Sequence, residues 1–376
     1  MDLSTTETQG MLRDTLARFL ADTYSFDARQ KMLASPEGRD PGIWRALSSE
    51  LGLTCAPFAE ELGGMGGGAI ENQIMMEELG KVIAIEPWLQ TVVAGGGALK
   101  AAGGALAEAT IPAIISGDCV IAFAYAEPQG RYNLADIGTT AKKDGSGYVL
   151  NGHKGVVYAA PWATHLLVTA RTGGSRRERD GVELFLVDAK AKGISRRDYP
   201  TVDGFRASEV YFENVAIPGE ALLSGGIDLI ERVVDECTVA ICAEATGIGR
   251  AMLAQTQDYT GQRKQFGVPI SKFQVLQHRM ADMLVEAEQI ASMALMGTLR
   301  IDAPAAERKA AVSMVKAKVA KSIRFIGQNA VQTHGGIGIT MELAIGHYFK
   351  RATMIEGQFG SADYHLERFE ALTYAA

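Results

Sequence analysis

The sequence predicts an α+β fold in which helical segments at both ends flank a β-rich middle segment. Three observations support this prediction: apolar residues at helical spacing near the N-terminus, short β-rich runs between turns in the middle, and long helical patterns after Gly225-Gly226. We expect a helical N-terminal domain at residues 1–118, a middle β domain at 119–224 and a helical C-terminal domain at 225–376.

The N-terminal third is expected to contain helices separated by glycine-rich turns. Thr5 is placed to cap a first helix, whose apolar face carries Met11, Leu12, Leu16, Phe19 and Leu20. Glycines cluster in Pro57–Gly68, which favours a loop because glycine has high backbone entropy and no side chain to pack. A helix over Ile70–Leu79 follows.

The middle segment alternates β-rich runs with turns. The expected strands are Val120–Tyr125, Gly138–Lys142, Tyr148–Gly152, Gly155–Tyr158, His165–Ala170, Val182–Val187 and Val210–Phe212. Asp144–Gly147 and Asn151-Gly152 are turn candidates. The charged loop Thr172–Gly181 could bind an anion, but its mixed charges favour a solvated hairpin tip.

Long helices are expected in the last third of the chain. They are Ile227–Gly261, Phe273–Ile301, Pro304–Thr333 and Leu343–Thr353, with Pro304 suited to a first helical turn.

Composition excludes several classes of protein. The 376 residues are 47% hydrophobic with a mean hydropathy of +0.03, which is typical of an ordinary folded chain. A net charge of −7 argues against nucleic acid or an anionic membrane as the main partner. Acid precedes any apolar run in Met1–Glu7, and lysine and glycines interrupt the apolar stretch Thr91–Leu106, so we expect no secretory signal, no membrane span and a cytoplasmic protein.

The cysteines and histidines do not indicate a metal site. Cys55, Cys119, Cys237 and Cys242 match neither a zinc spacing nor a disulfide framework, so we expect reduced, buried thiols. The histidines form no pair at helical spacing with an acidic neighbour.

The stretch Arg263–Met283 is the most informative part of the sequence. It predicts a helix end, a Gly-Pro break and a new helix with apolar residues at helical spacing. An arginine at such a break suits an anionic ligand, because its guanidinium can bind two phosphate oxygens at once.

A second motif, Gln332–Gly338, places three glycines within four positions after a long helix. Such a segment lets backbone amides approach a ligand closely, although a helix C-cap and turn would have the same composition.

Arg263–Met283 closely resembles the flavin-binding signature of the acyl-CoA dehydrogenases, and Gln332–Gly338 matches that family's Q-x-H-G-G-x-G element. The resemblance covers nearly the whole chain. It implies FAD as cofactor, a β-barrel-like middle domain, a C-terminal helical bundle, and an oligomer in which the two elements meet across a subunit contact. It also implies the residues that bind the pyrophosphate and adenosine end of FAD: Arg263, Phe266, Gln332, Gly335 and Gly336, with Gln274 nearby.

Two segments of the middle domain look like the family's flavin-ring loops, T-E-P-x-x-G-S-D and L-N-G-x-K-x-W-I-T-N. They are Phe123–Gly130 and Asn151–Lys154 with the residues that follow each. Ala126 stands at the usual flavin-bonding threonine, and Val156 and Tyr158 replace Trp and Thr. Arg131 and Tyr132 replace Ser-Asp.

Tyr125 and Tyr158 would supply stacking or a hydroxyl to the flavin, or they are aromatic residues of the strand core. The departures resemble the subgroup of the pimeloyl-CoA dehydrogenase small subunit, which also carries segments like Ala344–Arg351 and Asp363–Leu366.

The reaction implied by the resemblance is α,β-dehydrogenation of an acyl-CoA to the trans-2-enoyl-CoA. It needs a base for the Cα proton, which the family usually places in a Y-E-G-T loop. The ungapped match makes Glu356 the candidate base and substrate-binding residue, with Gly357 beside it; the alternative is a surface carboxylate in a loop. Some relatives place the base on an earlier helix, where Cys237 stands here, with Glu236 and Glu244 nearby.

The implied partners are an acyl-CoA substrate and an electron-transfer flavoprotein. The assembly would be a homodimer, a homotetramer or a mixed tetramer with a larger acyl-CoA dehydrogenase subunit. Two other interpretations stay open: a non-catalytic FAD-binding partner subunit, and a flavin oxidase or monooxygenase on the same fold.

Overall fold

The computed structural model of the protein describes residues 5–374, and the chain divides into two compact units. The first unit comprises Met1–Met32, Ala69–Ala84 and Thr238–Ala376, and the second comprises Leu33–Gly68 and Ile85–Cys237. Each unit is therefore built from segments that are separated in the sequence.

Helices form the N-terminal third, as the sequence predicts. They are α1 (Glu7–Thr23), α2 (Phe26–Ala34), α3 (Pro41–Arg45), α4 (Ala69–Lys81), the π-helical η4 (Leu89–Gly96), α5 (Gly97–Ala102) and α6 (Gly104–Ile115). The cap of α1 differs from the prediction: Thr6, not Thr5, accepts the amide of Gln9 at 3.2 Å, and the Gln9 side chain accepts the amide of Thr6 at 3.0 Å. We expected no secretory signal from the stretch Met1–Glu7. Its first four residues, Met1–Ser4, lie outside the described residues.

The middle segment forms a mixed eight-stranded sheet. Its strands are β1 (Ile121–Ala124), β2 (Thr140–Asp144), β3 (Gly147–Tyr158), β4 (His165–Arg171), β5 (Val182–Asp188), β6 (Ile194–Pro200), β7 (Arg206–Ile217) and β8 (Leu222–Leu223). The strand order is β6-β7-β3-β2-β4-β5-β8, and β1 pairs with β4 in parallel. Buried side chains from β1, β2, β3, β4, β5 and β7 gather in one hydrophobic cluster, so the sheet encloses a single core.

The long strand β3 differs from the sequence prediction. Asn151-Gly152 was expected to be a turn, but it lies inside β3 at a register shift, where Gly152 packs against Thr139. A side chain at Gly152 would clash with Thr139, so the glycine serves close strand packing there. The Asp144–Gly147 turn between β2 and β3 is confirmed.

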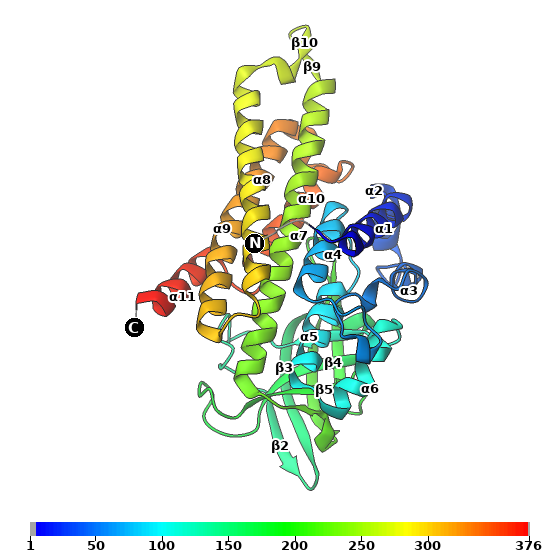
Figure 1. Cartoon of the computed structure of the whole chain (residues 1–376), viewed down its shortest axis with the longest axis vertical. Coiled ribbons are helices and arrows are strands. Elements are labelled where there is room, and N and C mark those ends of the chain that lie inside the picture. The colour runs from blue at the N-terminus through cyan, green and yellow to red at the C-terminus, as the bar shows by residue number, and fades with distance from the viewer. Residues whose placement is uncertain (1–4, 375–376) are drawn as a thin grey trace. The chain divides into compact units, whose positions relative to one another are not determined.

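The C-terminal third returns to helices. They are α7 (Gly226–Gln262), α8 (Gln274–Arg300), α9 (Ala305–His334), α10 (Ala344–Gly357) and α11 (Ala362–Tyr374). The short strands β9 (Lys264–Gln265) and β10 (Val268–Pro269) form a hairpin between α7 and α8 (Figure 1). α8 packs along α9, and α9 also packs against α10 and α11.

Within residues 5–374, α7 has the length and apolar composition of a membrane-crossing helix, but 83% of its most apolar stretch is buried inside the protein. Buried core helices have the same composition.

A buried ion pair fixes α10 against α7 in the first unit. Arg351 of α10 donates two hydrogen bonds to Glu244 of α7, from Nε to Oε1 at 2.6 Å and from Nη2 to Oε2 at 2.7 Å. Both side chains are at most 5% exposed. Such bidentate pairing fixes geometry as well as charge, and therefore sets the position of α10.

A second buried ion pair, in the second unit, joins the loop after β1 to strand β3. Lys154 of β3 is fully buried and donates to Glu127 Oε1 at 2.7 Å and to Thr169 Oγ1 at 2.9 Å. Glu127 also accepts the backbone amides of Gly138 at 2.7 Å and Thr139 at 3.0 Å. One carboxylate therefore ties both ends of the 127–139 loop to the sheet.

The pKa of Glu127 reflects this environment. Burial alone would raise it, but the charge of Lys154 and the hydrogen bonds from Lys154 and Thr139 outweigh burial and lower the pKa to about 2. Glu127 is therefore ionised at neutral pH.

We predict that Lys154→Met lowers the free energy of unfolding by about 3–5 kcal/mol, because it leaves the Glu127 carboxylate buried without its counter-charge. Urea unfolding followed by circular dichroism measures the loss. Lys143→Met, at an exposed lysine of β2, is the matched control and should cost less than about 0.5 kcal/mol. Equal unfolding midpoints for the two variants would contradict the prediction.

The same pair predicts a loss of stability in acid. The folded pKa of Glu127, about 2, lies below its ordinary value of 4.5, so its stabilisation is complete above about pH 4.5 and is lost as the pH falls toward 2. The double variant Glu127→Gln/Lys154→Met, which has no such carboxylate, should lose less stability than the unchanged protein between about pH 5 and pH 3. Urea midpoints at the two pH values test this, and identical losses would refute it.

Candidate functional site

The hairpin at the end of α7 carries the arginine motif. Arg263 directly follows α7, and its carbonyl accepts the amide of Ile270 at 2.8 Å, which closes the β9–β10 hairpin at its base. Phe266 and Gly267 form the tip with φ values of 54° and 84°. Phe266 is 92% exposed and meets Phe273 edge-on, with the ring centroids 6.1 Å apart. A fully exposed phenylalanine at a positive φ is costly, which suggests a binding role for the tip.

Polar side chains of this motif are available for a ligand. Arg263, at the base of the hairpin, is exposed, and so is Gln274, at the start of α8. Neither side chain makes a hydrogen bond or ion pair with any residue between 5 and 374. An arginine in this state can pair with a phosphate without first breaking another contact.

The glycine motif lies at the end of α9, next to the end of α7. Tyr259, one turn before Arg263, stacks on His334 with ring centroids 4.4 Å apart, and its hydroxyl donates to the His334 carbonyl at 3.3 Å. Burial lowers the pKa of His334, so its ring is neutral at neutral pH. The stack brings the helices that carry the two motifs together within one chain.

The backbone after His334 is open to close approach. Gly335 ends α9 with a φ of 65°, and neither Gly335 nor Gly336 has a neighbouring atom within 4 Å of where a side chain would start. Both glycines and Gln332 are exposed. The Gly335 amide itself donates to the carbonyls of Gln332 and Val331, but backbone with this much open space lets a phosphate-bearing ligand approach closely, so the residues present fit the pyrophosphate of FAD.

In the second unit, the two flavin-ring segments meet. The Ala126 carbonyl, just after β1, accepts the amide of Gly155 in β3 at 2.9 Å. Tyr125 packs on Phe123, with ring centroids 4.8 Å apart. Tyr158, at the end of β3, meets Phe205 edge-on at 6.2 Å. The structure therefore brings Ala126 and the last residues of β3 together, and it also gives Tyr125 and Tyr158 aromatic neighbours.

The backbone at the end of β3 is strained. Val156 has a φ of 51° at a register shift and is 47% exposed, although a β-branched residue rarely adopts a positive φ. Glu209 of β7 holds this bulge by accepting the Val156 amide at 3.4 Å and the Tyr199 hydroxyl at 2.9 Å. Nε2 of His153 lies 2.6 Å from Glu209. Strain supported this closely is typical of a functional position.

Glu356 lies in the last turn of α10 and not in the expected loop. Its side chain is 18% exposed and pairs with Arg324 of α9, whose Nε donates to Oε2 at 2.7 Å while Nη2 contacts Oε1. The buried Lys316 donates to the carbonyls of Ile355, Glu356 and Gly360 at 2.7–2.9 Å. Helix α10 ends at Gly357, so these charges fix the peptide around the candidate base.

The other candidate acids are engaged or blocked. Glu244 is bound by Arg351, and Glu236 accepts Nε of Arg232 at 2.7 Å. Cys237 is fully buried, and burial raises the pKa of its thiol well above the usual value. Glu244 and Cys237 therefore lack the exposure of a base that receives a proton from a substrate, whereas Glu236, which is 16% exposed, is paired with one arginine as Glu356 is.

The charged loop Thr172–Gly181 connects β4 and β5, and its arginines are paired. Arg176 and Arg177 bind Asp136 at 2.5 and 3.0 Å, and Arg179 binds Glu231 at 2.6 Å. Paired arginines have little left to offer an anion, so the hairpin-tip interpretation agrees with the structure better than the anion site does.

The predicted site residues fall into two groups. Arg263, Phe266, Gln274, Gln332, Gly335, Gly336, Glu356 and Gly357 belong to the first unit, and Tyr125, Ala126 and Tyr158 belong to the second. Sequence reasoning missed Lys154, Lys316, Arg324 and Arg351. Lys154, Lys316 and Arg351 are buried, and the signal for them in the sequence is a basic residue within a mostly apolar element. The spacing of residues in the sequence does not show which acceptor each of them binds.

Comparison with known proteins agrees with this geometry. Family models of the acyl-CoA dehydrogenase N-terminal, middle and C-terminal domains match residues 6–118, 122–215 and 224–371. The probable acyl-CoA dehydrogenase YngJ of Bacillus subtilis (strain 168) is 28% identical over 374 residues, which cover 96% of this chain and 97% of that protein.

Two solved structures share the fold. A variant of the Tcur3481-Tcur3483 steroid ACAD has a TM-score of 0.89 and 28% identity, over 97% of each chain. The ChsE4-ChsE5 complex from Mycobacterium tuberculosis has a TM-score of 0.90 and 24% identity, over 100% of each chain. With matching models for all three domains and relatives along its whole length, the chain belongs to the acyl-CoA dehydrogenase family of flavin-dependent oxidoreductases, whose cofactor is FAD.

Proposed function

We propose that the protein removes hydrogen across the α,β bond of an acyl-CoA thioester and yields the trans-2-enoyl-CoA, with Glu356 as the base. The observation that carries this proposal is the fixed Glu356 carboxylate at the end of α10, next to the helix-ending Gly357. Bound FAD would supply the hydride acceptor for this chemistry.

Glu356 would accept the proton from Cα of the substrate. A carboxylate is a weak base in water, so it needs shielding from solvent, and the side chain of Glu356 is only 18% exposed. Arg324 holds the carboxylate through Nε, which donates to Oε2 at 2.7 Å. Lys316 keeps the neighbouring peptide groups in place, so the carboxylate starts from one position.

The FAD contacts are proposed from the two groups of site residues. Arg263 would bind the pyrophosphate, with the exposed backbone of Gly335 and Gly336 and the side chains of Gln332 and Gln274 beside it. Phe266 would cover the adenosine end. Tyr125, Ala126 and Tyr158 would line the flavin ring; the contact between Ala126 and Gly155 supports this grouping.

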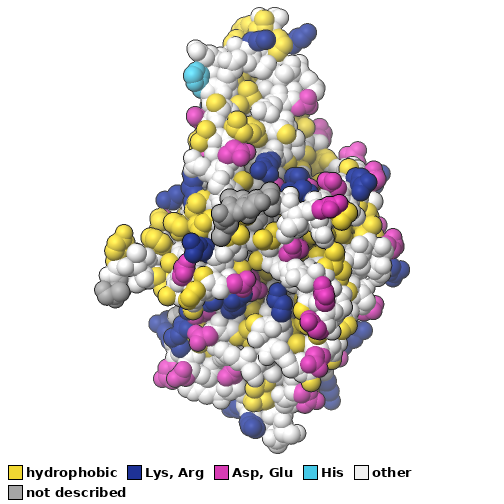
Figure 2. Space-filling view, in the orientation of Figure 1, with side chains coloured by type: hydrophobic (Ala, Val, Ile, Leu, Met, Phe, Trp, Pro, Cys, Tyr) yellow, Lys and Arg dark blue, Asp and Glu magenta, His cyan; other side chains and the backbone are white. Residues whose placement is uncertain are grey.

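Assembly into an oligomer is part of the proposal. Hydrophobic side chains are exposed at the hairpin and along α8, among them Phe266, Val275, Leu284 and Val285, and Figure 2 shows yellow side chains over this part of the surface. Exposed apolar surface of this kind is typical of a contact with another chain. A homodimer, a homotetramer or a mixed tetramer would cover it, and electrons would pass to an electron-transfer flavoprotein.

A second candidate function is a non-catalytic, FAD-binding partner subunit. The replacements at Ala126, Val156 and Tyr158 favour it, as does the similarity of fold to a structure described as a complex of two named chains. The same replacements are our reason for proposing that the chain is related to the pimeloyl-CoA dehydrogenase small subunit.

The flavin oxidase or monooxygenase alternative would be recognised by rapid reoxidation of the reduced flavin in air. A cytoplasmic location and the three-domain division at residues 118 and 224 remain proposals.

We predict that Glu356→Gln retains FAD and acyl-CoA but reduces the rate of flavin bleaching by substrate by at least about 10²–10⁴-fold. Glutamine keeps the shape and a hydrogen bond to Arg324 but cannot accept the Cα proton. Anaerobic mixing with a panel of saturated acyl-CoAs, followed at the flavin absorbance band, is the measurement.

The matched control is Glu367→Gln, at an exposed glutamate of α11, which should bleach at the rate of the unchanged protein. Unchanged bleaching by Glu356→Gln would place the base elsewhere. If the unchanged protein also fails to bleach with every substrate, the partner-subunit function is favoured.

Arg263→Ala should weaken FAD binding more than it weakens the fold. A charge-assisted hydrogen bond contributes about 1.5–3 kcal/mol, so the dissociation constant of FAD should rise about 10- to 100-fold. Flavin release on dilution, with thermal unfolding of the flavin-free protein as the stability reference, measures both effects. Arg18→Ala, at an arginine of α1, should leave both unchanged, and wild-type flavin affinity in Arg263→Ala would refute the assignment.

A further inference from the structure

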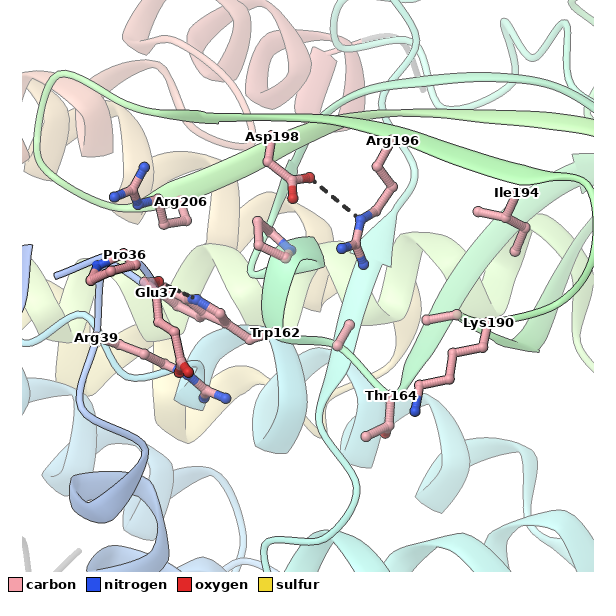
Figure 3. Close-up of a pocket in the computed structure, with 13 residues that line it drawn as sticks. Pro36, Glu37, Arg39, Trp162, Thr164, Lys190, Ile194, Arg196, Asp198 and Arg206 are labelled. Atoms are coloured by element: carbon pink, nitrogen blue, oxygen red, sulfur yellow. Dashed lines mark hydrogen bonds and ion pairs between the residues drawn. The ribbon is translucent and has the colours of Figure 1, made fainter.

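A cavity of about 860 Å³ lies in the second unit, and none of its lining residues is among those assigned to flavin or base. Its walls come from the loop after α2, from the short turn that follows β3 and from strands β6 and β7 (Figure 3). Pro36, Pro161 and Trp162 give it rigid apolar walls. The volume falls within the range of about 300–1,000 Å³ typical of small-molecule pockets.

The lining of this cavity is strongly cationic. Arg39, Lys190, Arg196 and Arg206 contribute four positive charges, and Glu37 and Asp198 contribute two negative ones, so the lining carries a net charge of +2. The whole protein has a net charge of −7. A local excess of positive charge on an acidic protein calls for an explanation specific to the site.

Arg196 forms an ion pair with one of the two carboxylates of the lining, Asp198. Arg196 donates to the Ala160 carbonyl at 2.9 Å and lies 3.4 Å from Asp198, which also accepts the Ser208 hydroxyl at 2.6 Å. Figure 3 shows this pair on the wall formed by β6. Asp198 is therefore already neutralised and does not offset the other cations.

Among the described residues, the side chains of the remaining three cations have no hydrogen-bonding acceptor, although the charges of Glu37 and Glu86 act on Arg39. Within residues 5–374, the side chains of Lys190 and Arg206 make no hydrogen bond or ion pair. Arg206 lies directly against Gly38, where the absence of a side chain leaves room for the guanidinium. Nε and Nη1 of Arg39 are buried and likewise donate to no acceptor.

Arg39 is held in place without its hydrogen bonds being satisfied. Its guanidinium carbon lies 5.0 Å from the ring centre of Trp162, a cation–π contact that fixes its orientation. The Trp162 indole in turn donates to the Glu37 carbonyl at 2.9 Å. Burial lowers the pKa of Arg39, with Glu86 and Glu37 opposing the change. Buried donors without acceptors are costly, and an anionic ligand would remove that cost.

We propose that this cavity binds the phosphate group of a nucleotide-sized phosphate ester. Three cations without hydrogen-bonding acceptors match a dianion better than a carboxylate, and two of them are guanidinium groups that can each bind two phosphate oxygens. The volume exceeds the need of phosphate alone, and the proline and tryptophan walls suit the flat part of such an ester.

The ester has two sources with the same chemistry: a free nucleotide, or the phosphorylated nucleotide portion of a CoA thioester. No residue of this cavity belongs to the proposed flavin or base groups, so the site stands even if the base assignment fails.

The test uses the purified protein with its FAD bound, titrated with ADP and separately with CoA, by calorimetry at low and at high salt. Binding should weaken with salt, because the contacts are ionic. Arg39→Gln, Lys190→Gln and Arg206→Gln should each weaken binding about tenfold or more. Arg45→Gln, at an exposed arginine of α3 outside the cavity, is the matched control and should leave affinity within about twofold.

Two positive outcomes separate the sources. ADP that binds beside saturating CoA, with sensitivity to the three variants, identifies a free nucleotide; CoA that displaces ADP with the same sensitivity identifies the substrate's own nucleotide. The proposal is overturned if neither compound binds, or if the three variants bind them as well as Arg45→Gln does. Lys190 is exposed and outside the core, so Lys190→Gln remains informative even if Arg39→Gln fails to fold.

Discussion

The ion pair between Lys154 and Glu127 is the constraint on which the geometry of the second unit depends. The fully buried ammonium of Lys154 needs hydrogen-bond acceptors. Glu127, in the loop after β1, and Thr169, in β4, supply them. Since Glu127 also holds the amides of Gly138 and Thr139, the loop after β1 cannot move independently of β3. The contact of Ala126 with Gly155, and with it the proposed flavin-ring surface, follows from that single charge pair.

The first unit uses buried charge in the same way. Arg351 and Glu244 fix the middle of α10, and Lys316 holds the carbonyls at its end, so the candidate base projects from a helix anchored twice. Burial lowers the pKa of Lys316 to about 8, with the nearby Cys242 opposing the change. In both units buried charges hold in place one segment that carries proposed site residues: α10 with Glu356 in the first unit, and the loop after β1 with Ala126 in the second. Hydrophobic packing alone would not fix such segments to one position.

The long elements were predictable because their signals are local. The expected helices over Ile227–Gly261 and Phe273–Ile301 match α7 and α8 to within one residue at each end, since apolar periodicity and glycine breaks are read directly from sequence. Strand β6 was missed because its residues are charged and mostly exposed. The partners of Lys154 and Arg351 lie 27 and 107 residues away, a separation at which spacing carries no information. The motif residues were found by resemblance, and the pairing of Glu356 with Arg324 required the fold.

The division of the chain into interleaved units has a consequence for synthesis on the ribosome. All segments of the second unit have been made once Cys237 is added, whereas the first unit joins Met1–Met32 and Ala69–Ala84 to everything from Thr238 onward. At about 5–20 residues per second, α1 and α4 wait roughly 15–60 s until the last of the helices that complete their core has been made. During that interval the face of α4 that later packs on α8 has no permanent cover. Apolar surface left uncovered in this way is where a nascent chain is open to aggregation, so the exposure lasts until the C-terminal helices are translated.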